Sequence, residues 1–254
     1  MNLEAKQATE DAQYIEKLAA VGIPVVYIDF REHPLTNTAP SMRLFGKLTG
    51  KEARAEDFIA WREAEMKRVT DVLAQADPQR PKVFVDRAGG YSDDCCMSFG
   101  DGNFGKFVEL AGGRNIAKDI IPGTFGTLNP EQIIASDPEH IIITGGYWEA
   151  YVPGGKWVGV GPGRDEAEAL RKLKALNARP AVQSVKAVEQ RQVHAIWHQF
   201  YNSPYHVVAI QKMAKWLHPE LFAELDPETT FRELHERFLP VDYRAGHWVS
   251  VTDE

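Results

Sequence analysis

Hydrophobic residues recur at three- and four-residue steps over residues Lys51 to Ala76, a spacing that predicts one long amphipathic helix. Its apolar stripe consists of Ala55, Phe58, Ile59, Met66, Val69, Val72 and Leu73, and charged residues fill the opposite face. The helix ends before Asp77-Pro78, because a residue that precedes proline is pushed out of the helical region. At about 1.5 Å per residue, roughly 26 residues span ~39 Å, the width of a small domain.

Strand and helix patterns alternate on both sides of this helix. Before it, the chain predicts a helix over Ala5–Ala20, a strand over Ile23–Phe30 and a short helix from about Thr38 to Leu48. After it, the predicted strands are Lys82–Asp86, His140–Thr144, Val193–Trp197 and an edge strand at HWVSV, with helices between them. This alternation predicts an α/β fold with a mainly parallel sheet.

The two sides of the long helix differ in completeness. A parallel sheet requires a strand before the helix Ala5–Ala20, where the chain offers only three residues. We therefore expect residues 1–36 to be the remnant of a first α/β lobe, residues 37–77 a connector that includes the long helix, and residues 78–254 a second α/β lobe. Because most of a first lobe is missing, we expect part of the apolar stripe to be exposed and buried by another copy of the chain.

Composition excludes several classes of protein. The chain has 254 residues, of which 44% are hydrophobic and 26% charged, and this balance is typical of a globular protein. Its net charge is −7 and its basic residues form no cluster, which argues against nucleic acid as a partner. No apolar run reaches the ~20 residues of a membrane helix, and the first residues lack the pattern of an export signal.

Unusual residues gather where the predicted strands end. Arg31 follows the first strand, the segment Arg87–Cys96 the second, Tyr147-Trp148 the third, and the segment His198–Tyr205 the fourth. In parallel sheets, ligands bind at the carboxyl ends of the strands. The sequence therefore predicts one binding site to which all four loops contribute.

Four segments of the chain resemble a known family. They are EKLAAVGIPVVYIDF, FVELAGGRNIA, LNPEQIIASDPEHIIITG and NARPAVQSVKAVEQRQVHAIW. They are similar to the substrate-binding proteins of ABC importers for iron-siderophore, haem and cobalamin complexes, in which one long helix joins two α/β lobes. The resemblance implies capture of a ferric siderophore or haem complex, delivery to a membrane permease, and a periplasmic or cell-surface location for the full-length family member. Cobalamin or a free metal ion is the alternative ligand within the same architecture.

A ferric siderophore or haem is large, partly aromatic and often anionic, so its site should offer flat rings and a few cationic donors. The rim residues of this chemistry are Arg31, Arg87, Tyr91, Tyr147, Trp148 and Tyr201. His198, Tyr201 and Tyr205 could in addition ligate iron, with His198 and Tyr201 the metal candidates, or contact only the organic part of the ligand. No resident cofactor and no catalytic residue are expected.

Two further features carry alternative interpretations. The resemblance implies that Glu131 docks on arginines of the permease, although an acid in the first turn of a helix also compensates the helix dipole. The adjacent Cys95 and Cys96 can be free thiols, soft-metal ligands or a vicinal disulfide that stiffens the rim loop, and we favour the disulfide.

Two other classes of function compete with solute binding. One is a hydrolase in which Cys95 or Cys96 acts as nucleophile and His198 as base, but no acid is placed to orient the histidine. The glycine-rich segment SFGDGNFG lacks the spacing of a phosphate-binding loop. The other is a remnant with only a structural or oligomeric role, which would follow from an incomplete first lobe.

Overall fold

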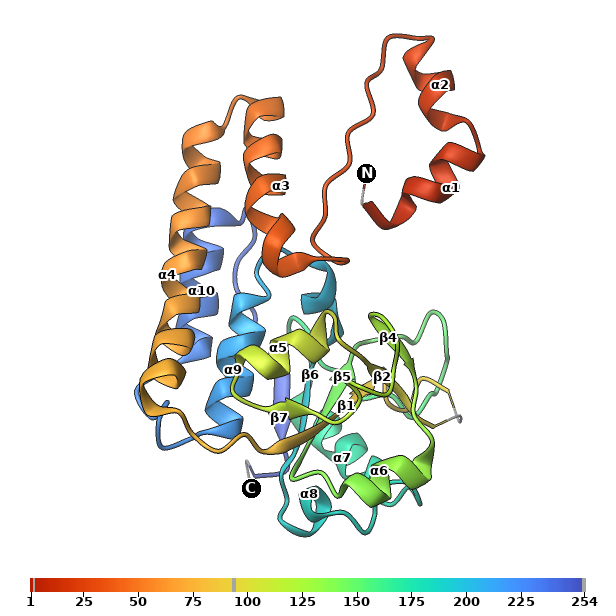
Figure 1. Ribbon diagram of the computed structural model, residues 1–254, viewed down its shortest axis with the longest axis vertical. Coiled ribbons are helices and arrows are strands. Elements are labelled where there is room, and N and C mark those ends of the chain that lie inside the picture. Colours follow the sequence, from red (N-terminus) through yellow and green to blue (C-terminus); the bar gives the residue numbers. More distant parts are fainter. Residues whose placement is uncertain (2, 93–94, 253–254) are drawn as a thin grey trace.

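Five strands form the central sheet of the computed structural model, which describes residues 1, 3–92 and 95–252 (Figure 1). Their order is β3 (Arg114–Asn115), β1 (Lys82–Arg87), β5 (His140–Gly145), β6 (Val193–Trp197) and β7 (Trp248–Ser250). The first four are parallel, and β7 pairs antiparallel with β6 at the edge. The predicted α/β fold with a mainly parallel sheet is confirmed, including the edge strand near the C-terminus.

Helices cover both faces of this sheet, so β1, β5 and β6 are buried along nearly their whole length and have apolar centres. Val83, Val85 and Ile142 lie in a core with α5 (Phe104–Leu110) and α9 (Val207–Leu217). Phe84, Ile141 and Ile143 alternate with them and face a second core. This second core contains α6 (Pro130–Ser136), α7 (Glu166–Leu176) and α8 (Lys186–Glu189).

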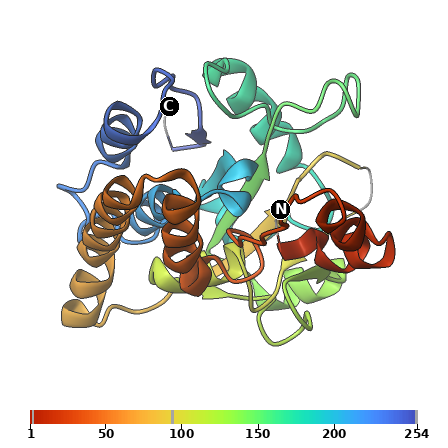
Figure 2. The same ribbon diagram turned by 90° about the horizontal axis from the view of Figure 1, so that it is seen from above.

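The long helix is α4 (Glu52–Ala76), and its apolar stripe is buried within the chain. It packs against α3 (Pro34–Thr49), α9 and α10 (Pro227–Phe238), and the ring of Phe58 lies 5.4 Å from that of Phe238. Viewed from above, α3, α4 and α10 group at one side of the sheet (Figure 2). The expectation of an exposed stripe is therefore wrong, because helices from both ends of the chain cover most of it. Self-association of the protein stays a prediction.

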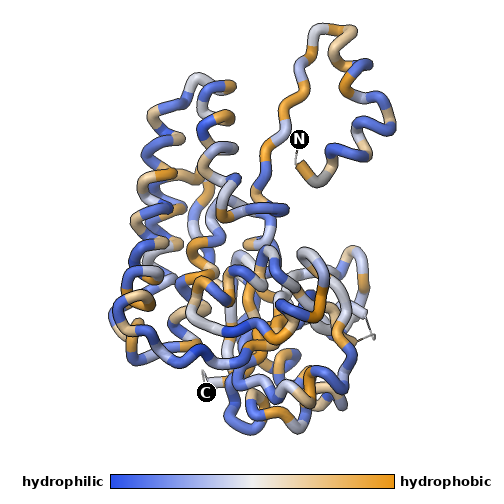
Figure 3. Tube along the Cα trace, in the orientation of Figure 1, coloured by the Kyte–Doolittle hydropathy of each residue, from blue (hydrophilic) through white to orange (hydrophobic). Residues whose placement is uncertain are grey.

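The first thirty residues form no sheet among the described residues. They contain η1 (Leu3–Ala5), α1 (Lys6–Asp11) and α2 (Tyr14–Ala19), so the helix predicted over Ala5–Ala20 is interrupted, at Gln13 with φ 54°. The strand predicted over Ile23–Phe30 is also wrong. Within it, Ile28 accepts a hydrogen bond from the Leu3 amide (2.8 Å) and donates one to the Met1 carbonyl (2.9 Å). The Val26 carbonyl accepts one from the amino group of Met1 (2.8 Å). Its apolar residues are coloured orange in Figure 3, and a strand of this composition needs neighbours to become a sheet.

The loop regions hold three elements that the periodicity did not predict. Strands β2 (Met97–Phe99) and β4 (Phe125–Thr127) pair antiparallel beside the main sheet. The 3-10 helix η2 (His198–Asn202) follows β6 directly, and α9 begins at Val207 after it. None of the helices within the described residues is long and apolar enough to cross a membrane.

Candidate ligand-binding site

Six of the eight predicted ligand-binding residues lie in one cluster at the carboxyl ends of β1, β5 and β6. The guanidinium of Arg31 lies over the ring of Tyr201, with its central carbon 4.9 Å from the ring centroid. Tyr201 in turn contacts His198 at 4.5 Å between ring centroids, and Trp148 meets His198 at 5.8 Å. Tyr91 completes the row, 5.2 Å from Trp148. We call these residues, together with Arg87, the rim cluster.

Arg87 carries the positive charge at the centre of this site. Its guanidinium donates to the sulfur of Met97 (3.3 Å) and lies over the ring of Phe125 at 4.8 Å. Burial lowers the pKa of Arg87, the positive charge of Arg31 lowers it further, and Tyr201 opposes both effects. Among the described residues, no carboxylate pairs with Arg87. The arrangement therefore favours an anion that supplies the missing negative charge.

His198 is held neutral inside the cluster. Its Nδ1 lies 2.8 Å from the hydroxyl of Thr144, which also accepts a hydrogen bond from the amide of Ala88. Burial, with smaller contributions from Arg87 and Arg31, lowers the pKa of His198 to about 3. A neutral imidazole keeps one nitrogen lone pair, which can ligate a metal or accept a hydrogen bond. No group of three or more His, Cys, Asp or Glu side chains within the described residues could hold a metal ion.

A buried carboxylate, Asp29, shapes the turn that presents Arg31. Asp29 accepts hydrogen bonds from the backbone amides of Arg31 (2.8 Å), Glu32 (2.8 Å) and His33 (2.9 Å) and from the side chain of Asn37 (2.8 Å). Burial raises its pKa, but the hydrogen bonds from Asn37 and these amides outweigh burial and lower it. Because its pKa is lowered, the ionised carboxylate stabilises the fold above pH ~4. Sequence reasoning did not identify this residue.

Asp29→Asn should lower the free energy of unfolding by about 1–3 kcal/mol, because the new amide group faces N–H donors where a carboxylate oxygen accepted their hydrogen bonds. For a chain of this size, the melting temperature should fall by roughly 2–4 °C per kcal/mol. The matched control is Asp101→Asn, which removes an exposed ion pair with Lys106 and should change stability by less than about 0.5 kcal/mol. Equal melting temperatures for Asp29→Asn and the wild type would contradict the role of this turn.

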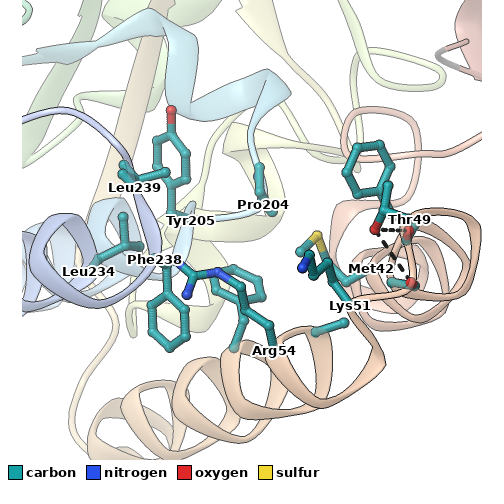
Figure 4. Close-up of a pocket in the computed structure, with 13 residues that line it drawn as sticks. Met42, Thr49, Lys51, Arg54, Pro204, Tyr205, Leu234, Phe238 and Leu239 are labelled. Carbon is teal, nitrogen blue, oxygen red and sulfur yellow. Dashed lines mark hydrogen bonds between the residues drawn. The ribbon is translucent and has the colours of Figure 1, made fainter.

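Tyr147 and Tyr205 lie apart from the rim cluster. Tyr147 is half exposed and stacks under the guanidinium of Arg164, 3.8 Å from its ring centroid. Tyr205 packs against Phe231 at 5.8 Å, and burial raises its pKa. It lines an apolar pocket of about 220 Å³ that α3, α4 and α10 enclose, and its hydroxyl points away from that pocket (Figure 4). The pocket shares no residue with the rim cluster.

The remaining predicted residues are Glu131 and the adjacent cysteines. Cys95 and Cys96 form a vicinal disulfide in the segment that follows Tyr91. Glu131 is exposed in the first turn of α6, where the side chain of Asn129 accepts a hydrogen bond from its amide (2.9 Å). Asn129 and Gln132 form a capping box there, as the sequence around Pro130 leads one to expect. Glu131 is thus free to meet a partner while it also favours the helix N-terminus.

Comparison with known proteins defines the class to which this chain belongs. Residues 5–198 match the family described as periplasmic binding protein, and the chain is a member of that family. It is 27% identical to a TroA-like periplasmic binding protein, FepB, from Veillonella parvula, with a TM-score of 0.87 over 98% of this chain and 71% of that chain. A periplasmic heme-binding protein from Pseudomonas aeruginosa shares the fold at 17% identity and a TM-score of 0.60, over 81% of this chain and 67% of that one.

A curated relative matches a shorter segment. It is a cobalamin-binding protein from Halobacterium salinarum, 31% identical over 102 residues, which make up 39% of this chain. The match covers 26% of the relative, so the chain spans about a quarter of that protein's length. The resemblance to substrate-binding proteins that the sequence indicated is thereby confirmed.

Proposed function

We propose that this protein captures an anionic iron chelate, a ferric siderophore or haem, and delivers it to the membrane permease of an ABC importer. The observation that carries the proposal is the half-buried guanidinium of Arg87 close to a second arginine, with no carboxylate partner among the described residues. The rings of Tyr91, Trp148 and Tyr201 beside it offer flat apolar faces to a macrocycle or a catecholate. Membership of the periplasmic binding protein family supports a location outside the inner membrane.

Cobalamin is the second candidate ligand, because the curated relative is a cobalamin-binding protein. A cobalamin also presents a large flat ring and a phosphate, so the same cluster could accept it. A hydrolase that uses a cysteine nucleophile is disfavoured, since that reaction needs a free thiol and the sulfurs of Cys95 and Cys96 are bonded to each other.

Titration with haemin, a ferric catecholate siderophore and cyanocobalamin, each followed by tryptophan fluorescence, tests the proposal. Trp148 lies in the rim cluster, so a bound chelate should quench its emission, and quenching should be weaker in Trp148→Phe. We expect saturable binding of at least one iron chelate at micromolar or lower concentration. Binding of cyanocobalamin alone would select the second candidate, and binding of none at 100 µM would overturn the proposal.

The role of Glu131 can be separated from ligand capture. Glu131→Ala should leave ligand affinity unchanged, because the side chain is exposed on α6 and is not part of the rim cluster. Uptake of the chelate by vesicles that contain the cognate permease should fall at least tenfold if the carboxylate pairs with permease arginines. The control is Glu168→Ala, an exposed acid on α7. Equal uptake by both variants would contradict the docking role.

A further inference from the structure

Asn103 connects two segments of the site that are far apart in the sequence. Its side-chain nitrogen donates one hydrogen bond to the backbone carbonyl of Arg31 (2.9 Å) and another to that of Tyr201 (2.8 Å). These residues lie 72 positions before and 98 positions after it. Their side chains form the stacked pair at the rim cluster. The same carboxamide therefore fixes the spacing of both backbones that present this pair.

Asn103 makes this bridge in place of the hydrogen bonds with which an asparagine at this position caps a helix. It occupies the position before α5, where an asparagine normally caps the first amides of the helix, yet it makes no capping hydrogen bond. Its backbone has φ 47°, and its Oδ1 is buried without a partner among the described residues. The orientation of the amide is defined, because the reverse orientation would set Oδ1 against two carbonyl oxygens. Departures from local rules of this kind concentrate at functional sites.

The bridge joins the turn that carries Arg31 to the segment that carries Tyr201. The turn with Arg31 is attached to α3, since Asp29 accepts from Asn37 and its amide donates to Ser41 (2.9 Å). Tyr201 belongs to η2, which directly follows β6 of the central sheet. A movement of α3 that carries the Arg31 turn away from the sheet must therefore break the hydrogen bond between Asn103 and the Arg31 carbonyl.

We infer that Asn103 is a positioning residue that latches the Arg31 turn to the sheet, so that Arg31 and Arg87 act on the same anion. The inference rests on the proposed function of the rim cluster and adds to it a contact that sets the position of Arg31 relative to Arg87. With the latch made, the Arg31 guanidinium stays stacked on Tyr201. With the latch broken, the Arg31 turn moves with α3 and the site loses one of its two cations.

Asn103→Gly is the decisive variant, because it removes the side chain with its carboxamide and glycine accepts the positive φ at this position. We expect its affinity for the iron chelate to fall at least tenfold, and Asn103→Asp, which replaces both donors by acceptors, to fall at least as far. In the background of Arg31→Gln, Asn103→Gly should produce no further loss, since Asn103 acts through Arg31. Independent, additive losses in the double variant would overturn the positioning role.

Asn129→Gly is the matched control, since Asn129 is a true helix cap at α6 outside the rim cluster. It should lower thermal stability and leave chelate affinity unchanged. Distances between spin labels at the exposed positions Leu48 on α3 and Arg171 on α7 give a readout that needs no ligand. The distance distribution should broaden in Asn103→Gly and remain narrow in Asn129→Gly.

The two readouts separate the latch from the proposed function. If no chelate binds the wild type while the distances still broaden in Asn103→Gly, the proposed function fails and the latch stands. If chelates bind the wild type and Asn103→Gly changes neither the affinity nor the distances, the latch is overturned and the proposed function stands.

Discussion

Lowering the pH from 7 to 5 is expected to remove most of the free energy of unfolding, because buried histidines are neutral in the folded protein. Burial is the largest cause in each case. It lowers the pKa of His140 and His247 to about 4, that of His198 and His206 to about 3, and that of His194 well below its usual value. The neutral state of His206 agrees with its surroundings, since its Nε2 lies 2.8 Å from the guanidinium of the buried Arg62.

The sign of the effect follows from the proton count. In the unfolded chain, a histidine has a pKa of about 6.5. Below that pH the unfolded state binds protons that the folded state excludes until its own lowered pKa is reached, so stability is present above pH ~6.5 and falls toward pH ~4. Each such histidine can lower the free energy of unfolding by up to about 1.4 kcal/mol per pH unit. Five together can lower it by up to about 7 kcal/mol per pH unit. A typical domain has only about 5–15 kcal/mol in total.

His247→Phe provides the test of this mechanism. His247 lies among Phe231, Tyr243 and Trp248, and its Nδ1 is buried without a partner among the described residues. Phenylalanine suits these aromatic surroundings and takes up no proton, so unfolding in guanidinium at pH 5 should require more denaturant than in the wild type. Substitution of the exposed His33 by Gln should change nothing. A free energy of unfolding that stays constant from pH 7 to pH 5 would contradict the mechanism.

The sequence predicted those parts of the fold in which a local pattern reports burial. Strands β1, β5 and β6 are covered on both faces and contain the short apolar runs VFV, III and AIW. Helix α4 shows its buried stripe at helical spacing. Because the carboxyl ends of parallel strands share one edge, Arg87, Trp148 and His198 could be assigned to one site before any contact was known.

What remained unpredicted depends on partners distant in the sequence. Asn103 and Asn129 both precede a helix, yet only Asn129 caps its helix, whereas Asn103 binds two carbonyls from other segments. Tyr201 and Tyr205 stand four residues apart, but the first belongs to η2 at the rim cluster and the second packs on Phe231. The segment Ile23–Phe30 has the composition of a strand, and composition alone cannot supply a neighbouring strand.

Replacing Arg87 by glutamine should weaken binding of an anionic iron chelate by about 1–3 kcal/mol, or roughly 5- to 150-fold, because a charge-assisted hydrogen bond is lost. The same substitution should leave the ligand-free protein equally stable or more stable. Burial and the nearby Arg31 both disfavour the charged guanidinium, and no carboxylate among the described residues compensates it. Opposite changes in affinity and stability are expected where a charge is kept for binding rather than for folding.

Arg171→Gln is the control for this last prediction, since Arg171 is largely exposed on α7 and pairs only at 3.9 Å with Glu168. It should change neither the dissociation constant of the chelate nor the melting temperature of the ligand-free protein. Calorimetric titration gives the first quantity, and thermal unfolding without ligand gives the second. Unchanged chelate affinity in Arg87→Gln would remove the guanidinium from the ligand, whereas a fall in stability without ligand would identify Arg87 as a structural residue. A selective loss of affinity would show that the fold retains a half-buried cation, with no carboxylate partner among the described residues, for the anion that it binds.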